Sequence, residues 1–235
     1  YPHTGIEALK HFNLRVHQGE KVLLLGKTGT GKTTIAQLLL RFYEPDKGKV
    51  LIGNKELKKF SLHSLREQIS YVPQDVFLFS DTVHNNISFG LKERATAEMV
   101  QKAAEFASIH NEITQFDKQY ETMIGERGVT LSGGQKQRIS IARALIKAPD
   151  LFIFDDCLSA VDSNTEKTIL ANLSRLMQDK TALFITHRIF FNFHFDLIIY
   201  IEDGHIAESG THESLLAKQG LYAELYQTQM SQNQE

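Results

Sequence analysis

The sequence predicts an α/β fold built on a mainly parallel β-sheet, with an antiparallel β edge and a helical subdomain inserted at approximately residues 75–148. Short apolar runs of strand length alternate with longer segments of helical periodicity, which is the pattern of a parallel sheet covered by helices. One such run, residues 22–25, breaks into a glycine-rich loop that leads into a helix. From residue 81 to about 116, apolar side chains recur at helical spacing without strand-like alternation.

Composition favours a single domain of moderate size. The 235 residues are 42% hydrophobic, enough for one core and a smaller subdomain. Lys and Arg number 26 against 28 Asp and Glu, and the net charge of -2 gives no global basic field, so we expect no nucleic-acid partner. The single cysteine, Cys157, excludes an internal disulfide and fits a reducing compartment.

The chain opens at Tyr1 without a methionine or a leader segment, so we expect an excised domain. Its nearest approach to a membrane span is 182–201, which His187, Arg188 and Asp196 interrupt. Charges at those depths are costly in lipid, so this stretch is predicted to be strand, loop and strand. Any spanning domain is expected upstream and absent from the chain.

The other elements follow from turn signals and periodicity. Mixed polar and apolar residues predict edge β structure over 1–20, and Pro45 to Gly48 separates a helix from a short strand. Gly204 marks a hairpin, and the Gln-rich tail after Gln227 is predicted to be disordered. The predicted helices are 33–42, 163–177, one ending before Pro149 and two short C-terminal ones; the predicted strands are 22–25, 49–52, 151–154, 181–186 and 197–201.

The loop after the first apolar strand has the spacing G-x-x-x-x-G-K-T, which predicts a phosphate cradle. Its glycines let backbone N–H groups turn toward a polyphosphate, and the following helix adds positive potential. Lys32 would reach the β- and γ-phosphates and the Thr33 hydroxyl would bind Mg²⁺. The alternative is a Gly/Thr-rich strand-to-helix turn. The residues expected to bind nucleotide are Gly26, Thr28, Gly29, Thr30, Gly31, Lys32, Thr33 and Thr34.

A second apolar strand ends in the acidic pair Asp155-Asp156. Asp155 is predicted to hold Mg²⁺ through water, and Asp156 to face the γ-phosphate and orient the attacking water. The alternative is an acidic cap for the following helix. His187 ends a third strand, where an imidazole could donate to the γ-phosphate; a structural loop histidine is the alternative.

Leu131-Ser132-Gly133-Gly134-Gln135 completes a pattern that resembles the nucleotide-binding domain of ATP-binding-cassette (ABC) transporters over the whole chain, 1–235. The phosphate loop resembles the family's Walker A, 151–155 its Walker B and 131–135 its signature motif. The resemblance implies ATP and Mg²⁺ as cofactors. It assigns Gln74 to the Q-loop, with roles in catalysis and Mg²⁺ binding, Asp162 to the D-loop, His187 to the switch histidine, and Tyr1 to an aromatic that stacks on adenine.

The signature motif implies a second domain of the same kind. In the family two such domains pack head to tail, and each signature closes over ATP on the other's Walker A, so Ser132, Gly133, Gly134, Gln135 and Asp162 count as nucleotide-binding residues. From the residues alone, Ser132 and its glycines are equally a helix cap with flexible backbone.

The segment 122–128 resembles the loop that exporters carry before the signature. That resemblance implies an exporter at the cytoplasmic face of the cell membrane, with Phe77-Leu78-Phe79 lining a groove for a coupling helix of the transmembrane domain; a buried loop anchor is the alternative for some of these side chains. Transport substrate is not encoded in this chain. A soluble ABC ATPase acting as a nucleotide-dependent clamp, or a regulatory ATP-binding subunit, is the competing function.

Two positions depart from the family pattern. Asp156 stands where the family usually has the catalytic glutamate, and Ile189-Phe190-Phe191 stands where Leu-Ser-Thr is usual. The shorter carboxylate predicts a slow ATP site in this chain. With an intact signature beside it, this position resembles the asymmetric pattern of heterodimeric exporters and of first domains in some two-domain transporters, which implies a partner that supplies a catalytic glutamate; a homodimer of two slow sites is the alternative.

Overall fold

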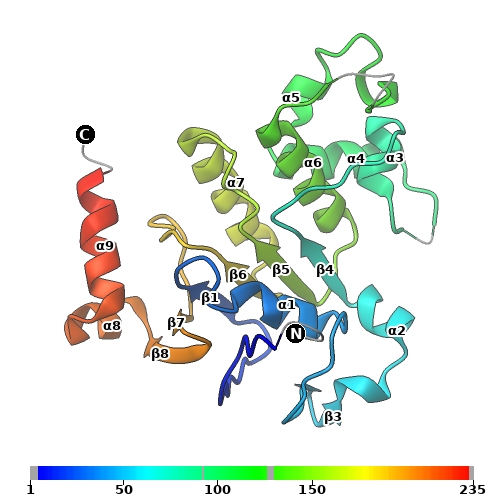
Figure 1. The fold of residues 1–235 in the computed structure, drawn as a ribbon. Coiled ribbons are helices and arrows are strands. Elements are labelled where there is room, and N and C mark those ends of the chain that lie inside the picture. Colours follow the sequence, from blue (N-terminus) through cyan, green and yellow to red (C-terminus); the bar gives the residue numbers. More distant parts are fainter. Residues whose placement is uncertain (1–4, 92, 126–129, 233–235) are drawn as a thin grey trace. The chain divides into compact units, whose positions relative to one another are not determined.

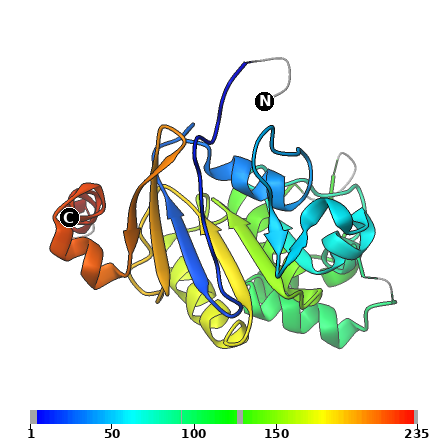
Figure 2. The same ribbon diagram turned by 90° about the horizontal axis from the view of Figure 1, so that it is seen from below.

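The computed structural model describes residues 5–91, 93–125 and 130–232. The chain divides into two compact units, and Figures 1 and 2 show its helices and strands coloured along the sequence. Unit 1 runs from the N-terminus to Ile69 and again from Asp179 to the C-terminus, and unit 2 runs from Ser70 to Gln178.

Unit 1 is built on the parallel strands that hold the predicted phosphate loop. In the order β6-β1-β7-β8, β1 pairs in parallel with β6 and β7, and β8 is antiparallel to β7 (Figure 2). Leu23 lies opposite Phe184 on one side and Ile198 on the other, and every side chain from Val22 to Leu25 is fully buried. These strands are β1 (Lys21–Leu25), β6 (Thr181–Ile185), β7 (Leu197–Glu202) and β8 (His205–Gly210).

The other elements of unit 1 lie before and after this sheet in the sequence. The antiparallel pair β2–β3 forms a hairpin, and α8 and α9 lie at the β8 edge (Figure 1). Their bounds are α1 (Lys32–Leu39), β2 (Leu51–Ile52), β3 (Lys55–Glu56), a 3-10 turn (Leu57–Lys59), α2 (Leu62–Glu67), α8 (His212–Lys218) and α9 (Leu221–Gln232).

Unit 2 holds the neighbouring strands β4 and β5 and most of the helices. Helix α6 lies at the centre of the helical part, where α3 and α4 pack against it and Ile139, Ile141 and Ala142 are fully buried. The elements are β4 (Ile69–Val72), α3 (Val83–Ser88), α4 (Ala97–Phe106), α5 (His110–Ile113), a 3-10 turn (Gln119–Glu121), α6 (Gly133–Ile146), β5 (Leu151–Asp155) and α7 (Ser163–Leu176).

The predicted edge β structure over 1–20 is wrong for the described residues 5–20, which form no strand. A ladder needs repeated backbone pairing. Lys10 N donates to Gly204 O at 2.9 Å and Glu20 O accepts from Ala182 N at 3.0 Å, but these contacts lie far apart along the segment, and the chain turns at His17–Glu20 between them. In that turn the Glu20 carboxylate accepts from His17 N at 2.7 Å.

The predicted disorder after Gln227 is also wrong as far as Gln232, because α9 continues through this segment. Its first residues are anchored: Tyr222 and Ala223 are buried, and the Glu208 carboxylate accepts from Leu221 N at 2.7 Å. Once the first turn is fixed, each added residue gains a helical hydrogen bond, and glutamine is a good helix former.

The segment 182–201 forms strand, loop and strand as predicted, with β6 and β7 on either side. A helix of the length and hydropathy needed to cross a membrane does not occur among the described residues.

Candidate nucleotide-binding site

The loop between β1 and α1 folds around the side chain of Lys32. Its ammonium donates to Gly26 O and to Lys27 O, each at 2.7 Å, and the residue is 9% exposed. The cation is therefore held within the loop, at the start of α1. A polyphosphate suits this concentration of positive charge.

Gly31 is required where the loop becomes a helix. It is the N-cap of α1 with a left-handed φ of 95°, and a Cβ there would clash with Ala8 O. Its carbonyl accepts from Thr34 N at 3.1 Å, which begins the first turn. Any other residue would need the loop or residue 8 to move.

Thr33 lies half-buried in the first turn of α1, and Asp155 ends β5 in unit 2. A hydroxyl and a carboxylate are the oxygen donors that Mg²⁺ takes alongside phosphates, so both residues fit the predicted metal. Among the described residues, three or more His, Cys, Asp or Glu side chains do not gather into a metal-binding group.

Asp155 is 1% exposed and is held by a residue that the sequence did not single out. The Tyr71 hydroxyl, from β4, donates to Asp155 Oδ2 at 3.1 Å. Burial, and then the nearby Asp155 carboxylate, raise the pKa of Tyr71, so the phenol stays protonated and keeps donating. The sequence indicated this contact only weakly, because Tyr71 is simply a tyrosine in β4, the strand next to β5.

Asp156 follows with a left-handed φ of 45°, a conformation that aspartate tolerates better than most residues. Its carbonyl accepts from Ser159 Oγ at 2.9 Å. The acidic pair is not the cap of the next helix, because Asp162 caps α7: its Oδ1 accepts from Asn164 N and Thr165 N at 3.1 and 3.0 Å. The helix-capping alternative for the pair is therefore wrong.

The signature motif begins α6 with a complete capping box. Ser132 Oγ accepts from Gln135 N at 3.2 Å, and Gln135 Oε1 accepts from Ser132 N at 2.9 Å. The cap that the sequence offered as an alternative is therefore present. It fixes the backbone at a helix start, where N–H groups favour an anion.

Glu112 of α5 holds the signature from the side, and sequence reasoning missed it. Its carboxylate accepts from Gln135 Nε2 at 2.9 Å and from the nearly buried Arg138 at 2.5 Å. Burial alone would raise the pKa of Glu112, but the hydrogen bonds from Arg138 and Gln135 lower it overall. Gln135, which caps α6, is therefore hydrogen-bonded to the ion pair of Glu112 and Arg138.

Gln137 ties the signature helix to the predicted D-loop, again without a signal in the sequence. Its buried amide donates to Ser159 Oγ at 3.1 Å and accepts from Ala160 N at 2.9 Å. The approach is so close that a Cβ on Gly134 would lie 2.8 Å from Ala160 O. Within unit 2 the structure thus brings together Ser132 to Gln135 and the segment that leads to Asp162.

Gln74 is exposed just after β4, at the start of the loop with the Phe77–Phe79 cluster. Arg143 donates to Phe77 O in that loop at 2.9 Å and to Asn86 O of α3 at 2.7 Å, which ties the loop to the helix. Burial lowers the pKa of Arg143 to about 10, which leaves it charged at neutral pH. Phe79 is half-buried, as expected for a side chain that anchors the loop, whereas Phe77 is 66% exposed.

His187 is exposed, two residues beyond β6 in unit 1. The bulky residues that follow are accommodated in an aromatic cluster: Phe190 and Phe195 both pack edge-on against Phe184 of β6, with ring centroids 6.2 and 5.3 Å apart. Phe190, which departs from the family pattern, therefore places its ring in the core next to the loop that carries His187.

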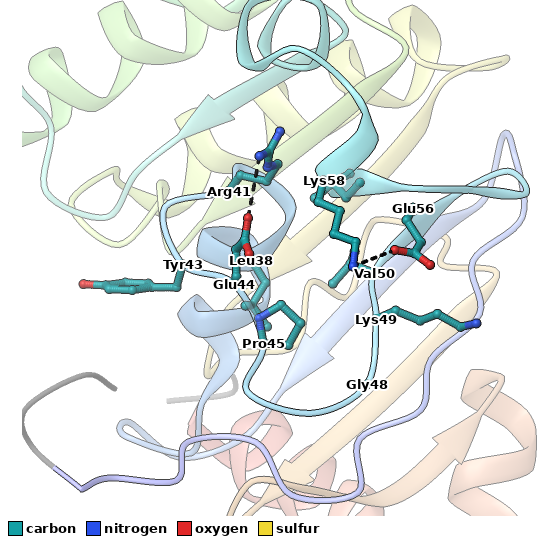
Figure 3. A pocket seen from close by; sticks show the side chains of 11 residues that line it. Leu38, Arg41, Tyr43, Glu44, Pro45, Gly48, Lys49, Val50, Glu56 and Lys58 are labelled. Atoms are coloured by element: carbon teal, nitrogen blue, oxygen red, sulfur yellow. Dashed lines mark ion pairs between the residues drawn. The ribbon is translucent and has the colours of Figure 1, made fainter.

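A small pocket lies elsewhere in unit 1, beyond the end of α1 (Figure 3). Its walls include the ion pairs Arg41–Glu44 at 3.6 Å and Lys58–Glu56 at 3.1 Å. At about 90 Å³ it is well below the roughly 300–1,000 Å³ of small-molecule sites, so it is not a nucleotide site. Tyr1 and part of the predicted exporter loop, 126–128, lie outside the described residues.

A parallel strand that runs into a glycine-rich loop and a helix, with a buried aspartate closing another strand, defines a P-loop nucleotide-binding domain. The chain belongs to the ABC transporter family, whose model, "ABC transporter", matches residues 9–159.

The chain is similar to ATP-dependent lipid A-core flippases. It is 43% identical over 232 residues to those of Salmonella paratyphi A and Escherichia coli, covering 99% of this chain and 40% of each flippase. It is also similar to a bacterial Atm1-family ABC exporter solved with ATP bound, at 39% identity and a TM-score of 0.90, covering 95% of this chain and 39% of that one. The chain thus spans about two fifths of the length of these relatives.

Proposed function

We propose that the chain is the ATP-binding and ATP-hydrolysing domain of an exporter, at the cytoplasmic face of the cell membrane, that pairs head to tail with a second such domain. The observation that carries this proposal is the signature motif, which is rigid yet exposed. Ser132 and Gln135 cap one another, Glu112 holds Gln135, and Ser132 and Gly133 stay open to solvent. A fixed, exposed helix start beside a D-loop suits an anion that belongs to another domain.

In this proposal Lys32 and the loop hold the phosphates, Asp155 and Thr33 hold Mg²⁺, and Gln74 and His187 act at the γ-phosphate. Bound Mg²⁺ would neutralise charge on the phosphates. ATP at the interface favours the closed pair and hydrolysis releases it, as a population shift. The transmembrane domain and the cargo belong to the rest of the protein; the names of the relatives favour a lipid or another large amphiphile.

We further propose that this chain's own ATP site is slow and that its signature completes a faster site on a different chain. The support is Asp156, whose carboxylate is withdrawn by one C–C bond, about 1.5 Å, relative to glutamate. A regulatory ATP-binding subunit is the second candidate, and the same side chain favours it.

The test compares Ser132→Ala with Ser61→Ala in the full-length protein with any co-purifying chain. Ser61 caps α2 as Ser132 caps α6, accepting from Ser64 N at 3.1 Å, so each change removes one cap worth about 1 kcal/mol. ATP hydrolysis should fall by about 10- to 100-fold in Ser132→Ala, as expected for a lost hydrogen bond to a charged group. It should be unchanged in Ser61→Ala, and equal effects would count against a shared site.

The exporter and the soluble clamp differ in what precedes this domain. Several apolar spans upstream of Tyr1 in the full-length protein, and ATP-dependent lipid movement in vesicles, are the expected findings for the exporter. A polar upstream extension would instead favour the clamp.

A further inference from the structure

The C-terminal helix holds the backbone on both sides of Arg188, next to the predicted switch histidine. Gln229 of α9 donates from Nε2 to His187 O at 3.3 Å and accepts at Oε1 from Ile189 N at 2.8 Å. One side-chain amide thus satisfies an acceptor and a donor in the loop that carries His187. Gln229 lies in the segment whose sequence predicts disorder.

A ring contact on the same face of α9 adds to this hold. Phe191 packs edge-on against Tyr226, with ring centroids 5.4 Å apart at 63°. Tyr226 lies three residues before Gln229, so both project from one side of the helix. Phe191 is one of the residues that depart from the family pattern, and here it contacts α9.

The helix can act as a support because its own start is fixed. Glu208 of β8 accepts from Leu221 N and Tyr222 N at 2.7 and 3.1 Å. The Tyr222 ring is buried, and its hydroxyl lies 2.7 Å from His212 Nδ1. Burial raises the pKa of Tyr222 to about 12, so the phenol remains neutral at physiological pH.

We propose that Gln229 is a positioning residue for His187. The inference rests on the proposed function, in which His187 acts at the γ-phosphate, and it adds that α9 sets the place of the imidazole by fixing its backbone. Loss of both hydrogen bonds would let the loop shift. A misplacement of about 1 Å at a reacting group can cost about 100-fold in rate.

The test uses Gln229→Ala in the full-length protein, with Gln227→Ala as the matched control, because Gln227 is an exposed glutamine on the same helix. Amide hydrogen exchange over residues 186–191 should become faster in Gln229→Ala and stay unchanged in Gln227→Ala. In a complex whose partner has its equivalent catalytic glutamate changed to glutamine, so that only this chain's own site is measured, the kcat for ATP should fall by about 10-fold in Gln229→Ala, with KM unchanged, as expected when an interaction specific to the transition state is lost. Gln229→Glu keeps the oxygen that accepts from Ile189 N, so its exchange rates and its kcat should change less than those of Gln229→Ala.

A double variant separates positioning from a general loss of structure. In a His187→Ala background, Gln229→Ala should lower kcat no further, since both changes act through one group. Unchanged exchange over 186–191 in Gln229→Ala, or fully additive losses of kcat, would overturn the inference. If His187→Ala alone leaves hydrolysis unchanged, the proposed role of His187 fails, and the link from Gln229 to hydrolysis fails with it; the exchange measurement then decides whether the hold on the loop exists.

Discussion

At the scale of single residues, the proposal of a slow ATP site in this chain rests on Asp156. Its φ of 45° places it at a sharp change of direction after the buried strand β5, so its carboxylate begins from a fixed backbone. A side chain one methylene shorter than glutamate cannot recover the lost reach by moving that backbone.

Asp156→Glu should raise kcat for ATP by about 10- to 100-fold, because it returns the carboxylate by about one bond length. The measurement is steady-state ATP hydrolysis by the full complex in which the partner's equivalent glutamate is changed to glutamine, so that the fast site does not mask the change, with KM followed separately. Asp155→Glu is the matched control, since it adds the same methylene to a neighbour that is 1% exposed and bonded to Tyr71. That change should lower activity; a rise in both variants would argue against the assignment of Asp156.

Glu112→Gln should destabilise the protein by about 1 kcal/mol, because Arg138 loses its charged partner while water screens part of the effect at a half-exposed carboxylate. The pKa of Glu112 is lowered on folding, so its contribution is present above the unfolded pKa of about 4.3 and is lost as pH falls through the folded value. Thermal unfolding of the two proteins should therefore differ at neutral pH and converge in acid. Glu105→Gln, whose carboxylate bonds only the exposed Gln101 among its described hydrogen bonds, should show little difference at either pH.

The site residues that could not be predicted are those whose contacts come from distant parts of the sequence. The phosphate loop is recognisable because its chemistry is contained in eight consecutive positions. Tyr71 meets Asp155 across 84 positions and Gln229 meets His187 across 42, so neither partner is marked by its neighbours in the chain. Glu112 and Gln137 look like ordinary polar helix residues until the fold places them against the signature motif.

At the scale of elements, the start of α6 has two adjacent glycines with different freedom. A Cβ on Gly133 would lie 3.3 Å from Ala160 Cβ, a contact that a shift of a few tenths of an ångström relieves, whereas a Cβ on Gly134 would lie 2.8 Å from the backbone atom Ala160 O. Alanine is otherwise the better helix former. The contact with the D-loop therefore decides whether replacing each glycine by alanine stabilises or destabilises the protein.

Gly133→Ala should leave the thermal unfolding midpoint unchanged or slightly raised, and Gly134→Ala should destabilise by about 1–3 kcal/mol, the usual cost of overpacking. Calorimetry of the two single variants provides the comparison, with each glycine serving as the control for the other. Equal midpoints would mean that the D-loop yields to the added methyl group.

Elements with their own pattern were predicted closely, and elements that depend on a partner were not. The strands β1, β5, β6 and β7 are continuous apolar runs, and such a run predicts a buried strand without reference to any other part of the chain. Their positions were therefore clear from the sequence. Residues 5–20 alternate like an edge strand but lack a paired ladder, and α9 looks like a polar tail until Glu208 fixes its start. In both cases the deciding interaction comes from another part of the chain.

At the scale of the whole molecule, the residues predicted to bind or act on nucleotide occur in both compact units. Unit 1 carries the phosphate loop and His187, whereas unit 2 carries Asp155, Gln74 and the signature motif. Each unit supplies groups that are incomplete for hydrolysis alone. In the proposed function, a second domain supplies the groups that this chain lacks.

A heterodimer predicts unequal roles for two equivalent carboxylates. In the complex purified from its native membrane, Asp156→Asn should lower ATP hydrolysis by less than about twofold, because a slow site contributes little to the total rate when the sites differ by the roughly 100-fold expected for a misplaced base. Changing the partner's equivalent glutamate to glutamine should remove nearly all hydrolysis. Ser132→Ala should behave like the partner change, since this chain's signature completes the fast site. If subunit analysis finds only this chain and Asp156→Asn abolishes hydrolysis, the complex is a homodimer in which aspartate itself serves as the base.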